Sequence, residues 1–296
     1  MKILICGARG FVGRRILKGL QAAGHTCILG VRKARPGKDY KDYMEMDFTQ
    51  DVTIESWLPR LKGVDAVINA IGILRDSKKQ PMSAIHGRAP AALFEACARA
   101  GVRRVVQISA LGVSGAVETR YFRSKGFAEQ ALIKQASRLE YLILRPSAIF
   151  GVEGSSAAIF LLQAKMPIHF LPMGGGQKMQ PVHVDDLVQV IANWLGQTAP
   201  VSQIVNATGS DVVTMAQMLA SYRRQLGRGP AWQIGVPKFL MNFAAWCGDS
   251  IPASPLSTEN LLMLNAGSTG DNTAFTELLG KPPQSVHAFI NPELQS

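Results

Sequence analysis

The chain opens with the stretch Met1-Lys-Ile-Leu-Ile-Cys-Gly-Ala-Arg-Gly-Phe-Val-Gly13. Residues 2–6 form an apolar run with the length of a buried strand, and apolar residues recur at helical spacing over 11–23. Glycines stand at positions 7, 10 and 13, where the first segment passes into the second. A strand, a glycine turn and a helix in this order are typical of the turn in which a doubly wound sheet holds a dinucleotide.

Each glycine has a predicted role in that turn. Gly7 allows the chain to turn, Gly10 lets the backbone approach a pyrophosphate, and Gly13 permits close packing of the helix on the strand. The helix N-terminus at Phe11 and Val12 supplies free N–H groups and a positive dipole end for the phosphates. The spacing is GxxGxxG rather than GxGxxG, and the alternative is an ordinary glycine-rich turn.

Basic residues follow the second predicted strand, at 26–31. Arg32 and Lys33 stand where a carboxylate would bind the ribose hydroxyls of NAD and a basic residue would bind the 2′-phosphate of NADP. Arg9, within the glycine turn, is placed to add a second cation. The pattern predicts NADP(H) in preference to NAD(H), the alternative being a solvated basic loop.

The composition bounds the class of protein. The chain has 296 residues, of which 47% are hydrophobic, and this is enough to bury a substantial core. The net charge of +11 is spread along the chain without a nucleic-acid-binding motif, so we expect no nucleic-acid partner. Because the first strand starts at the N-terminus and no stretch is long and apolar enough to span a bilayer, we expect a cytoplasmic protein. The cysteines are far apart and show neither zinc spacing nor a disulfide framework, so no metal site is expected: Cys6, Cys27, Cys97 and Cys247.

Strands and helices alternate through the first half, which predicts an α/β fold with a doubly wound parallel sheet. Asp47 ends a short strand, where it could meet the adenine edge. Asn69, Ala70 and Gly72 end a buried strand, and small residues there let the backbone pass close to a ribose or nicotinamide. Strands are expected at 2–6, 26–31, 43–47, 64–71, 102–109, 140–145 and 204–207, and helices at 11–23, 53–61, 90–100, 121–135, 157–165, 214–226, 237–248 and 258–264.

Three residues form a candidate catalytic group. Ser109 ends the strand at 102–109, on the edge where open α/β sheets bind ligands. Tyr121 and Lys125 are four residues apart on a predicted helix and therefore share one face. A nearby ammonium favours the phenolate, so Tyr121 could exchange a proton with a carbonyl oxygen that Ser109 holds. The alternative is a surface helix pair without a catalytic role.

Four motifs occur in order along the chain: Ile-Ser-Ala-Leu-Gly at 108–112, Arg-Tyr-Phe-Arg-Ser-Lys at 120–125, Leu-Arg-Pro-Ser-Ala-Ile-Phe-Gly at 144–151 and Gln-Pro-Val-His-Val-Asp-Asp-Leu at 180–187. With these motifs the chain resembles short-chain dehydrogenase/reductases of the atypical or extended branch. Within that branch it is most similar to the group of the accessory NADPH-binding subunit of respiratory complex I and its bacterial relatives, over about residues 1–280. The resemblance implies that the three glycines hold the pyrophosphate, that Arg32 holds the 2′-phosphate, and that Pro146 and Ser147 border the nicotinamide.

The second half predicts a smaller, mostly helical substrate lobe. We expect a Rossmann core over 1–150, completed by about 177–210, and a lobe made of 151–176 and 211–296. The segment 151–176 is expected to be an irregular lid around one helix, with a flexible glycine loop at 174–176. His183 is expected to be structural, and Asp185 or Asp186 to be a helix N-cap.

Residues 237–248 are unusually apolar. Phe239, Phe243 and Trp246 recur on one helical face. We expect that face to pack on the substrate lobe, and the alternative is a membrane-surface or partner-docking face.

Three functions are consistent with the sequence. The first is an NADPH-dependent oxidoreductase that transfers hydride to or from a carbonyl-type small molecule, with the triad of Ser109, Tyr121 and Lys125. The second is an NADPH-binding assembly, accessory or sensor protein without turnover. The third is a nucleotide-sugar epimerase or dehydratase with tightly held NAD, against which Arg32 argues.

Overall fold

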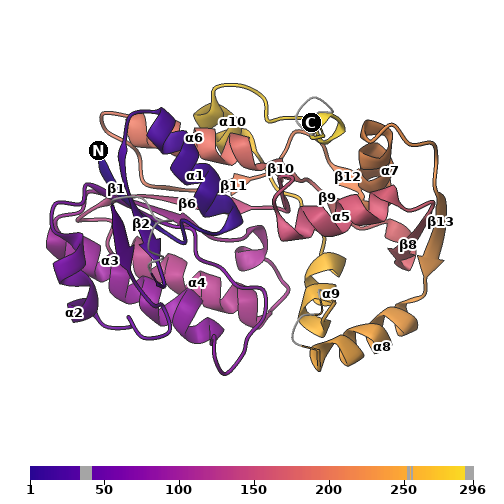
Figure 1. Cartoon of the computed structure of the whole chain (residues 1–296), viewed down its shortest axis with the longest axis horizontal. Helices are drawn as coiled ribbons and strands as arrows, with labels where there is room; N and C mark the ends of the chain where they lie inside the picture. The colour runs from indigo at the N-terminus through magenta and orange to yellow at the C-terminus, as the bar shows by residue number, and fades with distance from the viewer. Residues whose placement is uncertain (34–41, 252–253, 255, 291–296) are drawn as a thin grey trace. The chain divides into compact units, whose positions relative to one another are not determined.

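The computed structural model describes residues 1–33, 42–251, 254 and 256–290. Its chain divides into two compact units. Unit 1 comprises residues 1–114, 120–145 and 188–205, and unit 2 comprises 115–119, 146–187 and 206–296. Figure 1 shows the elements of both units along the chain.

A seven-stranded sheet forms the centre of the fold, in the order β3-β2-β1-β4-β5-β6-β11. The registered pairs from β3 to β6 are all parallel. The chain fills one side of β1 with β2 and β3 and then crosses to β4, so the order reverses between β1 and β4. This reversal is the point at which doubly wound sheets bind ligands, beyond the carboxyl ends of the strands. The strands are β1 (Lys2–Cys6), β2 (Thr26–Val31), β3 (Tyr43–Glu45), β4 (Ala66–Asn69), β5 (Arg104–Ile108), β6 (Glu140–Pro146) and β11 (Gln203–Ala207).

Helices cover both faces of this sheet because its strands are apolar on both sides. A core cluster joins Leu4 and Val67 of the sheet to Trp57, Phe94 and Leu132 of the helices on one face. On the opposite face α1 and α6 lie side by side (Figure 1), with Gly19 against Val188. The helices are α1 (Phe11–Ala22), α2 (Ile54–Trp57), α3 (Ala89–Ala100), α4 (Arg120–Ile133) and α6 (Val184–Gly196), with short helical turns η1 (Leu58–Leu61), η2 (Ser83–Arg88) and η3 (Leu111–Ser114).

The predicted doubly wound fold is confirmed, with a few local corrections. The helix expected over 53–61 is α2 followed by the 3₁₀ turn η1, which has a proline near its start. The strand expected over 64–71 ends at Asn69, because the Asn69 side chain accepts a hydrogen bond from the Ile71 N–H and turns the chain. The π-helix η2, ahead of α3, was not predicted. None of the helices in the described residues is long and apolar enough to cross a bilayer.

Unit 2 contains more regular structure than the sequence predicted. The helix predicted over 157–165 is present as α5, but the rest of the segment 151–176 is less irregular than expected, because strand β8 follows that helix. Strand β8 pairs in parallel with β13, which was not predicted. A core cluster that includes Phe150, Leu171 and Tyr222 holds the unit together. Its longer elements are α5 (Ser155–Lys165), β8 (Ile168–Pro172), α7 (Met215–Gln225), β13 (Trp232–Val236), α8 (Lys238–Asp249), α9 (Thr258–Asn265) and α10 (Thr273–Leu279). The short ones are β7 (Ile149–Phe150), η4 (Met173–Gly175), β9 (Lys178–Met179), β10 (Val182–His183), β12 (Val213–Thr214) and η5 (Val286–Ala288).

One arginine ties three of these segments together. The Arg223 guanidinium on α7 donates to the carbonyl oxygens of Ala164 (3.1 Å), Lys165 (3.3 Å) and Met166 (2.8 Å), at the end of α5. Its Nε donates to the carbonyl of Gly229, just before β13. These carbonyls include those that a helix C-terminus leaves without partners, so Arg223 caps α5 and fixes the approach to β13.

The start of α6 differs from the prediction in one respect. The helix begins at Val184, so the prediction of Asp185 or Asp186 as its N-cap is wrong and both lie in the first turn. There Asp186 accepts from the backbone N–H (2.7 Å) and side chain (3.1 Å) of Gln284. His183 packs against the rings of Phe150 and Phe289, as a structural residue would.

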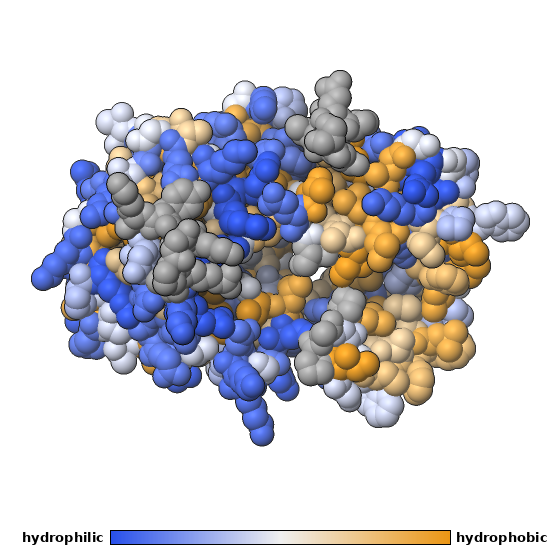
Figure 2. Space-filling view, viewed as in Figure 1, coloured by the Kyte–Doolittle hydropathy of each residue, from blue (hydrophilic) through white to orange (hydrophobic). Residues whose placement is uncertain are grey.

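The aromatic face of α8 is exposed. Phe239 is 70% exposed, Phe243 63% and Trp246 67%, and the buried residues of α8 are Ala245 and Gly248. The expectation that this face packs on the substrate lobe is therefore wrong. Figure 2 shows hydrophobic residues gathered over β13 and α8.

Candidate functional site

The glycine turn between β1 and α1 leaves no room for side chains at two positions. Gly7 has φ +83°, and a Cβ there would lie 3.0 to 3.3 Å from atoms of Ile71 and Ala70. A Cβ on Gly13 would lie 2.1 Å from the Gly7 carbonyl oxygen, so α1 approaches the turn as closely as only glycine permits. Gly10 is the N-cap residue, without a side-chain cap, so the first N–H groups of α1 face the turn. This backbone cradle fits a pyrophosphate.

Basic residues lie together at the end of β2, as the sequence analysis predicted. Arg9 donates through Nη1 to the carbonyl oxygen of Lys33 at 2.6 Å. With the Gln80 amide oriented to satisfy its neighbours, both Nη atoms of Arg32 lie 3.1 Å from the Gln80 side-chain oxygen. The side chains of Arg32 and Lys33 are exposed, so both are accessible to a solvent-borne phosphate. The nearby basic residues of 34–41 lie outside the described residues.

Two polar side chains predicted to border the cofactor, those of Asp47 and Asn69, form hydrogen bonds that fix turns of the nearby chain. Asp47 accepts from the N–H (2.9 Å) and hydroxyl (2.8 Å) of Thr49. Asn69 donates to Gln107 at 2.8 Å and accepts from the Ile71 N–H at 3.2 Å, so both of its amide atoms fix the end of β4. Next to it, Ala70 packs behind Gly7.

Lys125 lies at the carboxyl ends of two central strands. Its Nζ donates to the carbonyl oxygens of Ile71 (3.2 Å), just past β4, and Ile108 (2.9 Å), in β5. The side chain is buried, and burial lowers the pKa of Lys125 to about 8, although Glu129 opposes this shift. Tyr121 stands one turn earlier on α4, and burial raises its pKa to about 12. At neutral pH the Tyr121 hydroxyl is therefore protonated.

His86 is a residue of this site that sequence analysis missed. Its Nε2 accepts from the Ile73 N–H at 2.9 Å, so the ring proton is on Nδ1, which lies 3.1 Å from the Ser124 hydroxyl. Ser124 in turn donates to the Tyr121 carbonyl at 2.8 Å, and the His86 ring meets the Tyr121 ring edge-on at 5.4 Å. Burial, followed by the charge of Lys125, lowers the pKa of His86 to about 3, so the imidazole is neutral.

Ser109 belongs to a buried network that was also not predicted. Its hydroxyl donates to Glu129 Oε1 at 2.5 Å. Arg145 donates to the same carboxylate through Nε (3.0 Å) and Nη2 (2.5 Å), and Glu129 is 1% exposed. The only sequence signal was the spacing of four between Lys125 and Glu129, which places both on one face of α4. In this arrangement the Ser109 proton is directed to Glu129.

The structure thus brings Lys125 and His86 together beside Gly72, with the Tyr121 ring packed against His86. A Cβ on Gly72 would lie 3.6 Å from Lys125 Nζ and 3.9 Å from His86 Nε2. Ser147, in unit 2, donates through its hydroxyl to the Gln180 carbonyl at 2.5 Å, and its N–H donates to Ala207. Pro146 precedes it at the end of β6. No group of three His, Cys, Asp or Glu in the described part of the chain could hold a metal ion.

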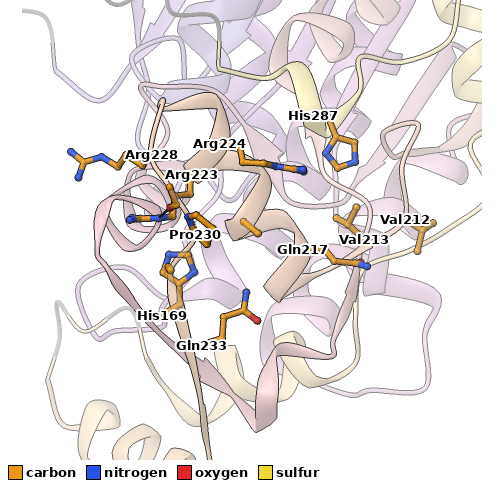
Figure 3. Close-up of a pocket in the computed structure, with 13 residues that line it drawn as sticks. His169, Val212, Val213, Gln217, Arg223, Arg224, Arg228, Pro230, Gln233 and His287 are labelled. Carbon is orange, nitrogen blue, oxygen red and sulfur yellow. Dashed lines mark hydrogen bonds between the residues drawn. The ribbon is translucent and has the colours of Figure 1, made fainter.

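A separate groove of about 630 Å³ lies within unit 2 between α7 and β13 (Figure 3). Basic residues line it, and in Figure 3 Arg224 extends toward His287 while Arg228 points away. None of the predicted catalytic or cofactor-binding residues lines this groove.

The comparisons with known proteins agree with the fold and the glycine turn. A family model described as NAD(P)H-binding matches residues 7–165, and the chain belongs to that family. The predicted resemblance to short-chain dehydrogenase/reductases of the atypical branch is confirmed. The protein therefore binds a nicotinamide nucleotide.

The chain is similar to two curated proteins and to one solved structure. The chain is 25% identical to UDP-glucose 4-epimerase of Vibrio cholerae, over 99% of this chain and 94% of that protein. It is 28% identical to NADH dehydrogenase [ubiquinone] 1 alpha subcomplex subunit 9, mitochondrial, of Arabidopsis thaliana, over 72% of this chain and 55% of that subunit, so it spans about half of that relative's length. A nucleoside-diphosphate-sugar epimerase from Staphylococcus aureus shares the fold, with a TM-score of 0.76, 18% identity and coverage of 98% and 99% of the two chains.

Proposed function

We propose that the protein is an NADPH-dependent oxidoreductase that reduces a carbonyl-type small molecule. The observation that carries this proposal is the pair of Tyr121 and Lys125 on one face of α4, with the Lys125 ammonium held by the carbonyls of Ile71 and Ile108. These carbonyls mark the sheet edge at which doubly wound folds bind their ligands.

The residues present fit the cofactor. Gly7, Gly10 and Gly13, with the first N–H groups of α1, would hold the pyrophosphate. Arg32, Lys33 and Arg9 would hold the 2′-phosphate, a dianion for which guanidinium groups are suited. When bound, the nicotinamide supplies the hydride.

The chain's own residues would handle the proton. A Tyr121 hydroxyl whose pKa is raised to about 12 is a proton donor at neutral pH, which suits carbonyl reduction. The Lys125 ammonium stabilises the phenolate that remains after Tyr121 has donated its proton. Ser109 would polarise the carbonyl by exchanging its bond to Glu129 for one to the substrate oxygen.

The first test is the loss of NADPH absorbance with a panel of aldehydes, ketones, enones and quinones. We expect oxidation that falls at least about a hundredfold in Tyr121→Phe, since a positioned acid contributes about 10² or more. Tyr43→Phe alters an exposed tyrosine on β3 and should leave the rate unchanged. Oxidation that is indifferent to Tyr121 would refute the assignment of the proton donor.

The second test addresses the cofactor. Arg32→Glu should weaken NADPH binding far more than NADH binding, because only NADPH carries the 2′-phosphate. Arg103→Glu makes the same change of charge at an exposed residue just before the N-terminal end of β5. The proposed cofactor site lies at the carboxyl ends of the strands, so this variant controls for net charge. Equal loss of both nucleotides in Arg32→Glu would contradict the 2′-phosphate assignment.

The second candidate is an NADPH-binding accessory protein without turnover. The bond from Ser109 to Glu129 favours it, because a serine committed to a buried carboxylate does not polarise a substrate. Tight NADPH binding without oxidation of any substrate in the panel would support this candidate. The full-length similarity to an epimerase keeps nucleotide-sugar chemistry as a third candidate, which bound NAD rather than NADPH in the purified protein would support.

A further inference from the structure

The outer face of the small sheet in unit 2 is apolar, although outward faces of sheets are normally polar. The parallel register pairs Trp232 with Ile168 and Ile234 with Phe170. Since side chains alternate along a strand, these four residues lie on one face. That face is open to solvent, with Trp232 79% exposed and Phe170 57% exposed. The intervening His169 and Leu171 are buried.

Two helices extend this apolar character within unit 2. Helix α8 starts two residues after β13 and exposes Phe239, Phe243 and Trp246 on one face, and the rings of Phe243 and Trp246 are 6.0 Å apart. Helix α5 exposes Leu162, and its C-cap residue Met166 is also exposed. The helix is joined to β8 by a hydrogen bond from the Gln163 side chain to the Phe170 carbonyl. We call the exposed apolar residues of α5, β8, β13 and α8 the apolar surface; its part over β13 and α8 is seen in Figure 2.

The two segments that carry the apolar surface are rich in cations and poor in acidic residues. The sequence contains no Asp or Glu between residues 154 and 184, nor between 212 and 248. These two stretches contain α5, β8, α7, β13 and all of α8 except its last residue, the exposed Asp249. Their exposed cations are Lys165, Lys178, Arg224, Arg228 and Lys238. Of these, Lys165 ends α5 and Lys238 begins α8, two of the elements that carry the apolar surface. Arg224 and Arg228 line the groove of Figure 3 together with His169 and Gln233. Because His169 and Gln233 alternate with the apolar residues along β8 and β13, this groove lies on the opposite face of that sheet.

We propose that the apolar surface binds the surface of an anionic lipid bilayer. The exposed tryptophan and phenylalanine side chains would enter the boundary of the acyl chains, and Lys165 and Lys238, on the same elements, would meet the anionic head groups. This binding is independent of turnover, and it adds to the proposed function a location for unit 2 at a membrane.

The tryptophans provide a direct readout. The chain has four, of which Trp57 and Trp194 are fully buried in unit 1, whereas Trp232 and Trp246 are exposed on the apolar surface. The full-length protein with NADPH would be titrated with vesicles of phosphatidylcholine containing 30% phosphatidylglycerol. We expect a blue shift of tryptophan emission, protection from acrylamide quenching, and co-flotation. Pure phosphatidylcholine vesicles or high salt should reduce binding, because the charges are then unpaired or screened.

Matched variants distinguish binding through the apolar surface from nonspecific adsorption to vesicles. Phe239→Ser combined with Phe243→Ser should lower the partition coefficient at least about tenfold, since each is a large aromatic side chain. Lys165→Glu combined with Lys238→Glu should abolish the preference for phosphatidylglycerol. Phe127→Ser removes an aromatic that is 55% exposed on α4 and should have no effect. NADPH binding, measured on each variant, reports that unit 1 is folded.

Three results would overturn the proposal: unchanged emission and no flotation with anionic vesicles, equal flotation of the Phe239/Phe243 variant, or a tryptophan blue shift without vesicles at rising protein concentration. The last result, with a dimeric mass in light scattering, would assign the apolar surface to a second copy of the chain.

Discussion

The buried ammonium of Lys125 gives a prediction that can be worked through from the structure. Its Nζ donates hydrogen bonds to two backbone carbonyls, and the side chain is almost fully buried. Burial lowers the pKa of Lys125 from 10.5 to about 8, so the unfolded chain holds this proton more tightly than the folded protein does. The charged lysine therefore destabilises the folded state at neutral pH.

The magnitude follows from proton linkage. A pKa difference of about 2.5, at about 1.36 kcal/mol for each pKa unit, gives a cost of roughly 3 kcal/mol. The full cost applies below about pH 8, where both states are protonated, and it disappears as the pH rises toward 10.5. Between pH 8 and pH 10 we expect the wild-type free energy of unfolding to gain about 2 kcal/mol relative to Lys125→Met.

Urea unfolding of the wild-type protein and Lys125→Met at pH 7, 8, 9 and 10 measures this difference. The variant also loses two hydrogen bonds to carbonyls, but that loss is independent of pH and shifts the whole curve by a constant. Groups that titrate in both proteins cancel in the difference. Parallel curves across this pH range would show that Lys125 titrates as an ordinary solvated amine and would refute the argument.

Two further predictions concern packing and buried charge. Gly13→Ala should lower the free energy of unfolding by about 1 to 3 kcal/mol in chemical denaturation, because its Cβ would lie 2.1 Å from the Gly7 carbonyl oxygen. In the control Gly196→Ala the new Cβ meets no atom within 4 Å, so the free energy of unfolding should be nearly unchanged. Equal effects of the two substitutions would contradict the close approach of α1 to the glycine turn. Glu129→Ala should cost about 3 to 5 kcal/mol by leaving Arg145 without its carboxylate, against about 0.5 kcal/mol for Glu95→Ala in the exposed pair with Arg99. Similar thermal midpoints for Glu129→Ala and the wild type would show that the buried pair contributes little.

The part of the fold predictable from sequence is the part specified by neighbouring residues. The segments β1, α1 and β2 match the prediction almost to the residue, because an apolar run, a glycine turn and an amphipathic stretch each carry their own signal. The spacing of Tyr121 and Lys125 likewise defines a helical face without any tertiary information.

The unpredicted features depend on residues distant in sequence. The Ser109, Glu129 and Arg145 network needs β5, α4 and β6 to be assembled before its members meet. His86 reaches Ser124, 38 residues later, from a π-helix that has no reliable sequence signature. The pair of β8 and β13 joins segments more than 60 residues apart. For α8, periodicity correctly gave the apolar face but contained no information on what covers it.

The arginine cap described at the end of α5 has a consequence for any binding at β8 and β13. Because Arg223 secures the end of α5 and the approach to β13 with one guanidinium, the backbone beneath the outward-facing aromatics is ordered before a ligand arrives. Binding at this sheet then orders side chains but not the backbone, so less conformational entropy is lost and the affinity for a given contact area is higher. Unit 1 would thus bind a soluble nucleotide, and unit 2 would bind its partner through a surface whose backbone is already ordered.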